Sequence, residues 1–318
     1  MKTKVFALLT LILISQSLSA KAQAAWSNGD FAGMSYQIYT PETHQGEKPG
    51  LMVTLHGCLQ KGEDLRAAGN WEAAAEESNL VVVAPNAPNG GVILGCWDYY
   101  GADHTAENRH NGPLIRLTEA LVASARLNID RARVFVSGLS SGGGEAFVVG
   151  CLRPDLFAGV GLSSSPVLGS TSSELKNPGI TGPEAARLCR RLAGSRAGHL
   201  ATQVASIIAD PRDSIVASVH YERSTAALAE LYGAGENERF ELDELEGPNK
   251  SGMGLYKKDG SGHRRVSLIL NNGLGHAWPA GAMVTGGGWW VKASPYISNN
   301  SVNYPKYLAK FLTESALR

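Results

Sequence analysis

The feature that most constrains this chain is a series of short, almost wholly apolar segments that alternate with helical patterns. The clearest apolar segments are residues 50–57, 80–85, 133–137, 204–209 and 266–270. Continuous apolar runs of this length are typical of strands that are buried on both faces of a parallel sheet. Leucines at helical spacing over 113–126 indicate an intervening helix. The alternation predicts an α/β fold, with helices on both faces of a mostly parallel central sheet.

Weaker patterns complete this outline. We expect further strands at 34–40 and 157–162, and helices at 71–77 (with Asn70 as the N-cap), 142–151 and 304–317. Residues 163–198 are rich in Ser, Gly and Pro and are expected to form an insertion above the sheet edge, and residues 247–265 a loop or hairpin. No linker rich in Pro, Ser or Thr interrupts the chain, so residues 25–318 are expected to form a single domain.

The N-terminus has the three parts of a secretory signal. Lys2 and Lys4 precede an apolar run over 5–14, and a polar stretch then ends in Ala22-Gln-Ala24. The run is about half of the roughly 20 residues that a spanning helix needs, so residues 1–24 are predicted to be a signal peptide, with an uncleaved anchor as the alternative. We therefore expect a secreted or periplasmic protein, with no membrane segment after cleavage.

Composition and motifs exclude several classes of function. The chain has 29 basic and 29 acidic residues, and this balance argues against a nucleic-acid partner. It contains no C-x-x-C, H-E-x-x-H, G-x-G-x-x-G or Walker motif, so we expect no metal and no nucleotide cofactor. In an exported protein the four cysteines favour disulfides, and three pairings are open. They are Cys58, Cys96, Cys151 and Cys189.

The chemistry is indicated by Gly138-Leu-Ser140-Ser-Gly142, a G-x-S-x-G motif between a predicted strand and a predicted helix. In this context the serine lies at a sharp turn where its hydroxyl projects above the sheet, and flanking glycines leave room for the turn. The following helix directs its N–H groups toward a developing oxyanion. Ser140 is therefore the predicted nucleophile, and the alternative is a tight serine–glycine turn without chemistry.

A serine nucleophile needs a base and an acid that orients the base. His276 follows the last predicted strand in a glycine-lined loop, which suits a catalytic imidazole. The acid is expected after the 204–209 strand, where Asp213 is favoured and Asp210 is the alternative, because Pro211 suits Asp210 to opening a turn. The order Ser140, Asp213, His276 is that of the α/β-hydrolases.

Two backbone amides should complete the site as an oxyanion hole. We expect them from Ser141, next to the nucleophile, and from Cys58, in the loop after the first core strand. His56 could serve as a base in a different arrangement, but a side chain held at the strand end is the favoured interpretation. Trp97 and Trp278 are expected to wall a substrate groove, with core packing as the alternative. The run at 286–290 is the best candidate for an exposed rim.

Together these strings resemble a known family. Residues 54–60 (TLHGCLQ), 96–98 (CWD), 138–142 (GLSSG), the turn from Asp213 to Val216 and 275–279 (GHAWP) are similar to secreted esterases grouped with the poly(3-hydroxybutyrate) depolymerases. The related feruloyl and acetylxylan esterases share much of this layout. The resemblance covers about residues 30–315.

The resemblance implies an α/β-hydrolase fold, no metal or cofactor, and ester hydrolysis through an acyl-enzyme. It also implies a disulfide between Cys58 and Cys96 that braces the oxyanion loop. With that pair formed, Cys151 and Cys189 would join the nucleophile helix to the insertion. Many family members have histidine and glycine before the acid turn, whereas this chain has Ala209 and Asp210.

The expected function is that of a secreted serine esterase whose substrate is a short-hydroxyacid polyester or its oligomers. A feruloyl or acetyl ester on a carbohydrate is the first alternative, and a non-catalytic secreted binding protein on the same fold is the second. Many depolymerases carry a polymer-binding module after a linker, and no such module is found in the residues that follow His276.

Overall fold

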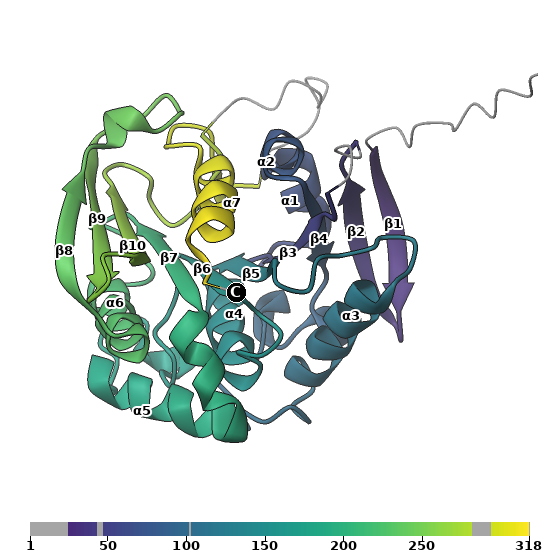
Figure 1. Cartoon of the computed structure of the whole chain (residues 1–318), viewed down its shortest axis with the longest axis horizontal. Coiled ribbons are helices and arrows are strands. Elements are labelled where there is room, and N and C mark those ends of the chain that lie inside the picture. The colour runs from purple at the N-terminus through teal and green to yellow at the C-terminus, as the bar shows by residue number, and fades with distance from the viewer. Residues whose placement is uncertain (1–24, 43–46, 102, 282–293, 318) are drawn as a thin grey trace, which may run out of the picture.

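The centre of the molecule is a sheet in the order β1-β2-β4-β3-β5-β6-β7-β10-β9-β8 (Figure 1). The computed structural model describes residues 25–42, 47–101, 103–281 and 294–317. The predicted signal peptide at 1–24 and the predicted rim at 286–290 lie outside these described residues.

The middle of the sheet is parallel, and its strands are the apolar segments of the sequence. Neighbouring strands run in parallel from β4 through β3, β5, β6 and β7 to β10. All residues of the first five of these are buried, which explains why their sequences are continuous apolar runs instead of alternating ones. The strands are β3 (Gly50–Leu55), β4 (Leu80–Pro85), β5 (Val134–Leu139), β6 (Gly159–Ser163), β7 (Val204–Ala209) and β10 (Arg264–Asn271).

Both edges of the sheet are antiparallel. β1 (Ala25–Phe31) pairs with β2 (Met34–Thr40) at one edge, and β8 (Ala234–Phe240) pairs with β9 (Gly252–Asp259) at the other. β9 and the turn after it lie in the region 247–265 that was expected to be a loop or hairpin, and β9 pairs with β10, the strand expected at 266–270. The sequence analysis did not find β1 or β8, because most of their side chains are exposed and give no apolar pattern. The charged residues of β8 suit an edge strand that must not pair further.

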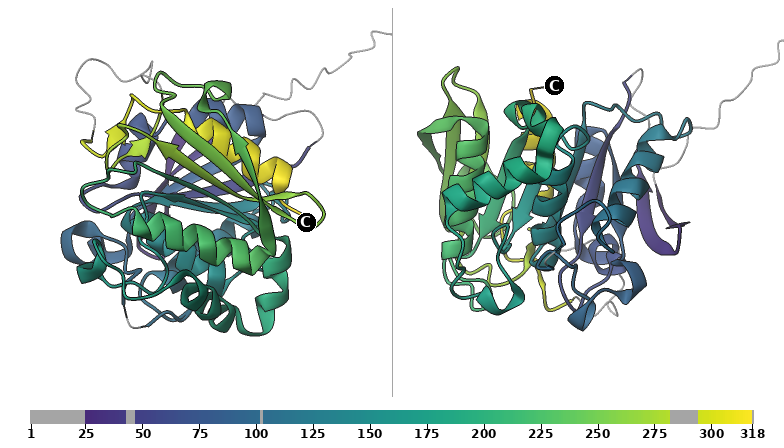
Figure 2. Two further views of the ribbon diagram at one scale, coloured as in Figure 1. Left: turned by 90° about the vertical axis from the view of Figure 1, so that its left-hand side faces the viewer. Right: turned by 90° about the horizontal axis from the view of Figure 1, so that it is seen from below.

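Helices cover both faces of the sheet (Figures 1 and 2), which confirms the predicted arrangement. Each face buries its own apolar cluster between helices and strands. One face carries α1 (Gly62–Ala68), α2 (Trp71–Ser78) and α7 (Tyr304–Ser315). The other carries α3 (Asn111–Ala123), α4 (Ser141–Leu152), α5 (Gly182–Ala193) and α6 (Val219–Tyr232).

Short elements connect these layers. A two-stranded parallel sheet joins β11 (Trp278–Pro279) to β12 (Ile297–Ser298). Single 3-10 segments span Pro88–Gly90, Ile93–Gly95, Ser172–Glu174, Gly194–Thr202 and Leu242–Glu244. Within the described ranges, no helix is long and apolar enough to cross a membrane.

Asn70 differs from its predicted role as a helix cap. Its backbone is left-handed, with φ at 58°, and its side chain makes no cap hydrogen bond to α2. The side-chain amide instead donates to the carbonyl of Ala280 at 2.7 Å. Asn70 therefore ties the start of α2 to the segment after β11.

Two disulfides join the pairs that the family resemblance suggested. Cys58 is bonded to Cys96, which links the loop after β3 to the loop after the Ile93–Gly95 segment. Cys151 is bonded to Cys189, which links α4 to α5. The region 163–198 thus contains a helix that is covalently fixed to the helix following Ser140.

Candidate active site

Ser140 occupies a strained turn between β5 and α4. Its φ of 52° and ψ of −119° lie in a region that side-chain-bearing residues rarely adopt, and such strain persists only where the surrounding structure enforces it. Gly138 and Gly142 allow the turn, because a Cβ on Gly138 would stand 2.4 Å from the carbonyl carbon of Gly142. A Cβ on Gly142 would stand 2.5 Å from the carbonyl oxygen of His56. The start of α4 is therefore pressed against the end of β3.

The predicted base and acid lie together at the carboxyl ends of β10 and β7. Nδ1 of His276 is 2.7 Å from Oδ2 of Asp213, and both side chains are almost completely buried. Because a carboxylate only accepts hydrogen bonds, Nδ1 carries the proton and Nε2 is left to accept one. His276 lines the same pocket as Ser140.

The Asp213 carboxylate is held ionised by its partners. Burial raises its pKa, but the hydrogen bond and charge of His276 and the backbone N–H groups of Ile215 and Val216 outweigh burial and lower the pKa below its ordinary value. The two N–H groups donate to Oδ1 at 2.7 and 3.0 Å, which leaves Oδ2 for the imidazole. The ionised carboxylate therefore holds the imidazole by its Nδ1–H group.

The carboxylate of Asp210 accepts hydrogen bonds from backbone N–H groups and does not contact the imidazole. Its Oδ1 accepts from the N–H of Arg212 at 2.9 Å, as expected for a residue that opens a turn. Its Oδ2 accepts from the N–H of Gly275 at 2.8 Å. Asp213 therefore orients the imidazole ring, whereas Asp210 holds the residue that precedes it.

The predicted oxyanion donors line the pocket together with Ser140. Ser141 opens α4, where the N–H groups of the first turn have no partner within the helix. Cys58 and Ser141 both line the pocket. His56 is buried behind them, with Nδ1 donating to the Gly57 carbonyl at 2.8 Å and Nε2 accepting from the Ala87 N–H at 3.2 Å. Burial lowers the pKa of His56, so a neutral side chain is held at the strand end.

The pocket has a volume of about 400 Å³ and walls that are mostly apolar. Three side chains at its mouth are unusually exposed for their type: Leu59 at 61 %, Ile93 at 74 % and Leu94 at 62 %. The sequence analysis missed these three, although an apolar triplet in a glycine-rich loop (Val92-Ile-Leu94) was a usable signal. The remaining apolar lining comes from Tyr99, Tyr100, Leu139, Leu175, Ile215 and Tyr296.

Leu59 and Leu94 are fixed in place by their backbones. Both have a positive φ, 63° and 58°, which costs free energy in a residue with a Cβ. The N–H of Leu59 donates to the carbonyl of Leu94 at 2.8 Å, and the Cys58–Cys96 disulfide joins the same two loops. The rim of the pocket is therefore a braced structure.

The expectation that Trp97 and Trp278 wall the groove is wrong, because both side chains are fully buried and neither lines the pocket. Trp97 packs between the rings of His56 and His110. Trp278 packs against Trp71, and its Nε1 donates to the Gly69 carbonyl at 3.0 Å. Each indole supports a loop from behind, but only that of Trp278 donates its N–H to a carbonyl, because Nε1 of Trp97 has no hydrogen-bond partner among the described residues.

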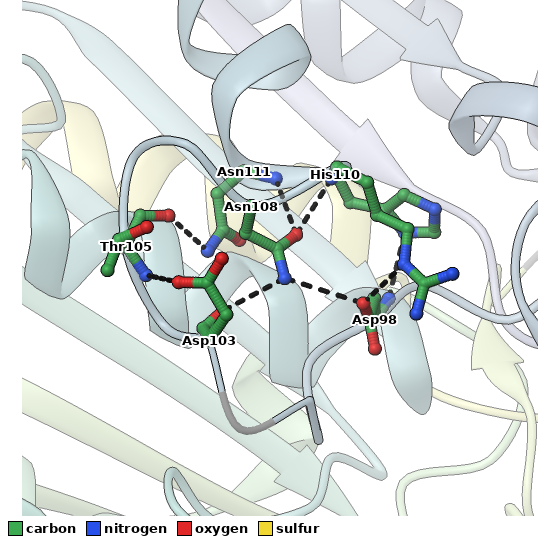
Figure 3. A network of polar contacts seen from close by, with 7 residues as sticks. Asp98, Asp103, Thr105, Asn108, His110 and Asn111 are labelled. Carbon is green, nitrogen blue, oxygen red and sulfur yellow. Dashed lines mark hydrogen bonds and ion pairs between the residues drawn. The ribbon is translucent and has the colours of Figure 1, made fainter.

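A polar network holds the loop that carries Tyr99 and Tyr100 (Figure 3). Buried Asp98 accepts from Nε of Arg109 at 2.8 Å, and its backbone N–H donates to Nδ1 of His110 at 2.9 Å. His110 is buried as well, and burial lowers its pKa to about 4. Its neutral ring is thus a structural acceptor, which the local sequence does not indicate.

No group of three or more His, Cys, Asp or Glu side chains that could hold a metal ion occurs among the described residues.

Comparison with known proteins identifies the family. The family model described as "Esterase PHB depolymerase" matches residues 34–236. The chain belongs to the esterase PHB depolymerase family. A poly(3-hydroxybutyrate) depolymerase of Ralstonia pickettii is 32 % identical over 310 residues, which cover 93 % of this chain and 61 % of that enzyme. An acetylxylan esterase A of Talaromyces purpureogenus is 27 % identical over 188 residues, covering 53 % of this chain and 47 % of that enzyme.

Solved structures with lower sequence identity show the fold. An acetyl xylan esterase from Aspergillus awamori has a TM-score of 0.64 at 19 % identity, covering 79 % of this chain and 94 % of that one. A ferulic acid esterase has a TM-score of 0.54 at 13 % identity, covering 92 % and 98 %. The predicted α/β-hydrolase fold of this family member is thereby confirmed.

Proposed function

We propose that the protein is a serine esterase with Ser140 as nucleophile, His276 as base and Asp213 as the residue that orients it. The observation that carries this proposal is the 2.7 Å contact between His276 and Asp213 at a pocket that also contains Ser140 on its strained turn. Similarity to depolymerases and esterases supports the same reaction class.

In the proposed reaction, Nε2 of His276 takes the Ser140 proton as Oγ attacks the ester carbonyl. The backbone N–H groups of Cys58 and Ser141 stabilise the resulting oxyanion. The C–O bond to the leaving alcohol then breaks, and His276 returns the proton to that alcohol. Water attacks the acyl-enzyme with the same proton transfers, which releases the acid and regenerates Ser140.

Replacing Ser140 tests this function directly. Ser140→Ala should abolish hydrolysis of a soluble p-nitrophenyl ester, while circular dichroism shows an unchanged fold. A fluorophosphonate probe should label the wild-type protein at Ser140 and leave the variant unlabelled. Retained turnover by pure Ser140→Ala protein would refute the assignment, and failure to label the wild type would favour the non-catalytic binding protein.

The proposed substrate is a short-hydroxyacid polyester or its oligomers. The apolar rim of Leu59, Ile93 and Leu94 supports this choice, because exposed leucine and isoleucine contact an aliphatic chain better than a hydroxyl-rich sugar polymer. The depolymerase relative also matches almost the whole chain, whereas the acetylxylan esterase matches about half. A feruloyl or acetyl ester on a carbohydrate remains the second candidate, supported by the acetylxylan esterase relatives.

A substrate panel with a rim variant separates these candidates. Ile93→Ser should slow hydrolysis of hydroxybutyrate oligomers and leave a p-nitrophenyl acetate assay nearly unchanged. Leu317→Ser is the matched control, because Leu317 is also exposed but does not line the pocket. Faster wild-type turnover on acetylated or feruloylated xylan than on the oligomers would replace the polyester by the carbohydrate ester.

We further propose that the protein acts outside the cytoplasm as a single catalytic domain over residues 25–318, after removal of residues 1–24. Both disulfides support this compartment, because such bonds persist in oxidising surroundings. The pocket is lined by residues from Gly57 to Tyr296, so the site draws on segments spread over most of the chain.

A further inference from the structure

Gln60 connects the loop after β3, which contains Cys58, to the Ser294–Tyr296 segment, which lies beside His276. Gln60 itself does not line the pocket. It lies two residues after Cys58 and is 3 % exposed. Its Oε1 accepts from the N–H of Gly57 at 2.9 Å, and its own backbone N–H donates to the Gly57 carbonyl at 3.3 Å. These two bonds close a turn around Cys58, whose amide is a proposed oxyanion donor.

The other end of the side chain reaches the segment that faces the base. Nε2 of Gln60 donates to Oγ of Ser294 at 3.0 Å and approaches the carbonyl of Tyr296 at 3.5 Å. Tyr296 lines the pocket, and its ring is nearly perpendicular to that of His276, with centroids 6.3 Å apart. The N–H of Trp278 donates to the Tyr296 carbonyl at 2.8 Å, so this segment is also paired with the chain just after His276.

The chemistry fixes the orientation of the amide. The Gly57 N–H is a donor and requires an acceptor, so the oxygen of Gln60 faces Gly57 and the NH₂ group faces Ser294. Because the side chain is buried, an apolar replacement would leave the Gly57 N–H without a partner as well as breaking the bond to Ser294. One side chain thus holds together two segments that are 234 residues apart in sequence.

We propose that Gln60 is a positioning residue that sets the spacing between the oxyanion amides and His276. This proposal rests on the proposed function. Gln60 touches neither the reacting atoms nor substrate, and it acts through the Gly57–Cys58 turn and the Ser294–Tyr296 segment. Transition-state stabilisation depends steeply on such spacing, because loss of one oxyanion donor costs about 10²–10³ in kcat and a misplacement of about 1 Å costs about 10².

Gln60→Met tests the bridge, because methionine matches glutamine in length but offers no amide. We expect kcat on a soluble ester to fall about 10- to 100-fold with KM changed little, the pattern of an interaction that acts in the transition state. Gln203→Met is the matched control. Gln203 is equally buried, and its amide bridges the carbonyls of Gly150 and Phe157 away from the pocket. It should lower stability and leave kcat near the wild-type value.

Ser294→Ala separates bridging from a purely local role in the turn. It removes the Gln60–Ser294 bond, together with the 3.4 Å bond from the Tyr296 N–H to Oγ of Ser294, and leaves the Gln60–Gly57 contact in place. If Gln60 bridges, Ser294→Ala lowers kcat as well, and the double variant loses less than the product of the two single losses. Wild-type kcat in Ser294→Ala, additive losses in the double variant, or equal kcat in Gln60→Met and Gln203→Met would overturn the proposal.

The two failures can be told apart. Residual activity in Ser140→Ala protein would refute the proposed function itself. If Ser140→Ala is inactive and Gln60→Met is fully active, only the positioning role of Gln60 is refuted.

Discussion

At the scale of single residues, the site depends on side chains whose neighbours decide their role. Asp210 and Asp213 lie three positions apart in the same turn and have the same chemistry. Asp213 receives two backbone N–H groups on one oxygen and offers the other to His276. Asp210 uses its two oxygens for the N–H groups of Arg212 and Gly275. Only Asp213 can therefore stabilise a charged imidazole.

Amide replacements should separate these two roles. Asp213→Asn should lower kcat on a soluble ester by about 10³–10⁴, because an amide cannot stabilise the imidazolium and favours the wrong tautomer. Asp210→Asn keeps an acceptor for the loop and should cost much less. The reverse ranking in steady-state kinetics would transfer the acid role to Asp210.

The sequence was sufficient for some residues and insufficient for others. Ser140 and His276 could be chosen because glycine spacing and order along the chain are local properties. Trp97 and Trp278 could not be placed, because a side chain next to a site in sequence can point into the pocket or into the core behind it. The exposure of Leu59 likewise depends on a positive φ that no residue-type rule assigns to leucine.

At the scale of elements, α4 is the helix on which the site depends most. All its residues are buried, including Glu145, whose carboxylate oxygens have no hydrogen-bond partner among the described residues. Burial, and secondarily the charge of Asp98, raises the pKa of Glu145 to about 8. The helix that follows Ser140, the proposed nucleophile, therefore carries a carboxyl group that is mostly neutral at pH 7.

From the buried carboxyl group of Glu145 we predict that the protein loses stability at alkaline pH. The folded-state pKa of Glu145 lies above its ordinary value of 4.5. Below pH 4.5 the carboxyl is protonated in both the folded and the unfolded protein, and the stability of the fold is at its full value. As pH rises toward 8 the unfolded protein ionises while the folded protein does not, so the free energy of unfolding falls. From pH 5 to pH 9 the wild type should lose about 4 kcal/mol of unfolding free energy that Glu145→Gln retains. Urea titrations measure the difference, with exposed Glu107→Gln as the control. Equal pH dependence in wild type and Glu145→Gln contradicts the prediction.

The two disulfides form a matched pair, because each joins cysteines 38 residues apart. On the loop-entropy account, removing either should cost about 4 kcal/mol. Cys151→Ala/Cys189→Ala should retain kcat at a temperature where the variant is folded. Cys58→Ala/Cys96→Ala should also lose kcat, because that bond joins the two loops of the pocket rim. Equal kcat in the two double variants would show that the rim needs no covalent brace.

At the scale of the whole molecule, the parallel sheet brings distant segments to one edge. The turns after β5, β7 and β10 all follow carboxyl ends of parallel strands, which is where α/β folds place their sites. The antiparallel strands β9 and β8 extend the sheet beyond β10, so the edge of β10 that faces away from β7 is paired with β9.

The proposed export gives a prediction for the chain that includes residues 1–24. Expressed in a bacterial host with residues 1–24, the exported protein should begin at Ala25 by mass spectrometry, because a small residue at each recognised position favours cleavage after Ala24. It should also contain no free thiol, since all four cysteines are paired. A form that keeps residues 1–24 in the membrane fraction would favour the uncleaved anchor.

The amino-acid sequence by itself determined the strand series, the nucleophile turn, the histidine loop and the family, because these depend on short apolar runs and on residue types at fixed spacing. The tertiary structure alone decided which aspartate meets the imidazole, which apolar side chains form the rim, and that Gln60 joins segments from opposite ends of the chain. Those choices arise where separate loops converge, and the free energy of a long-range contact depends on burial and geometry that no local pattern records.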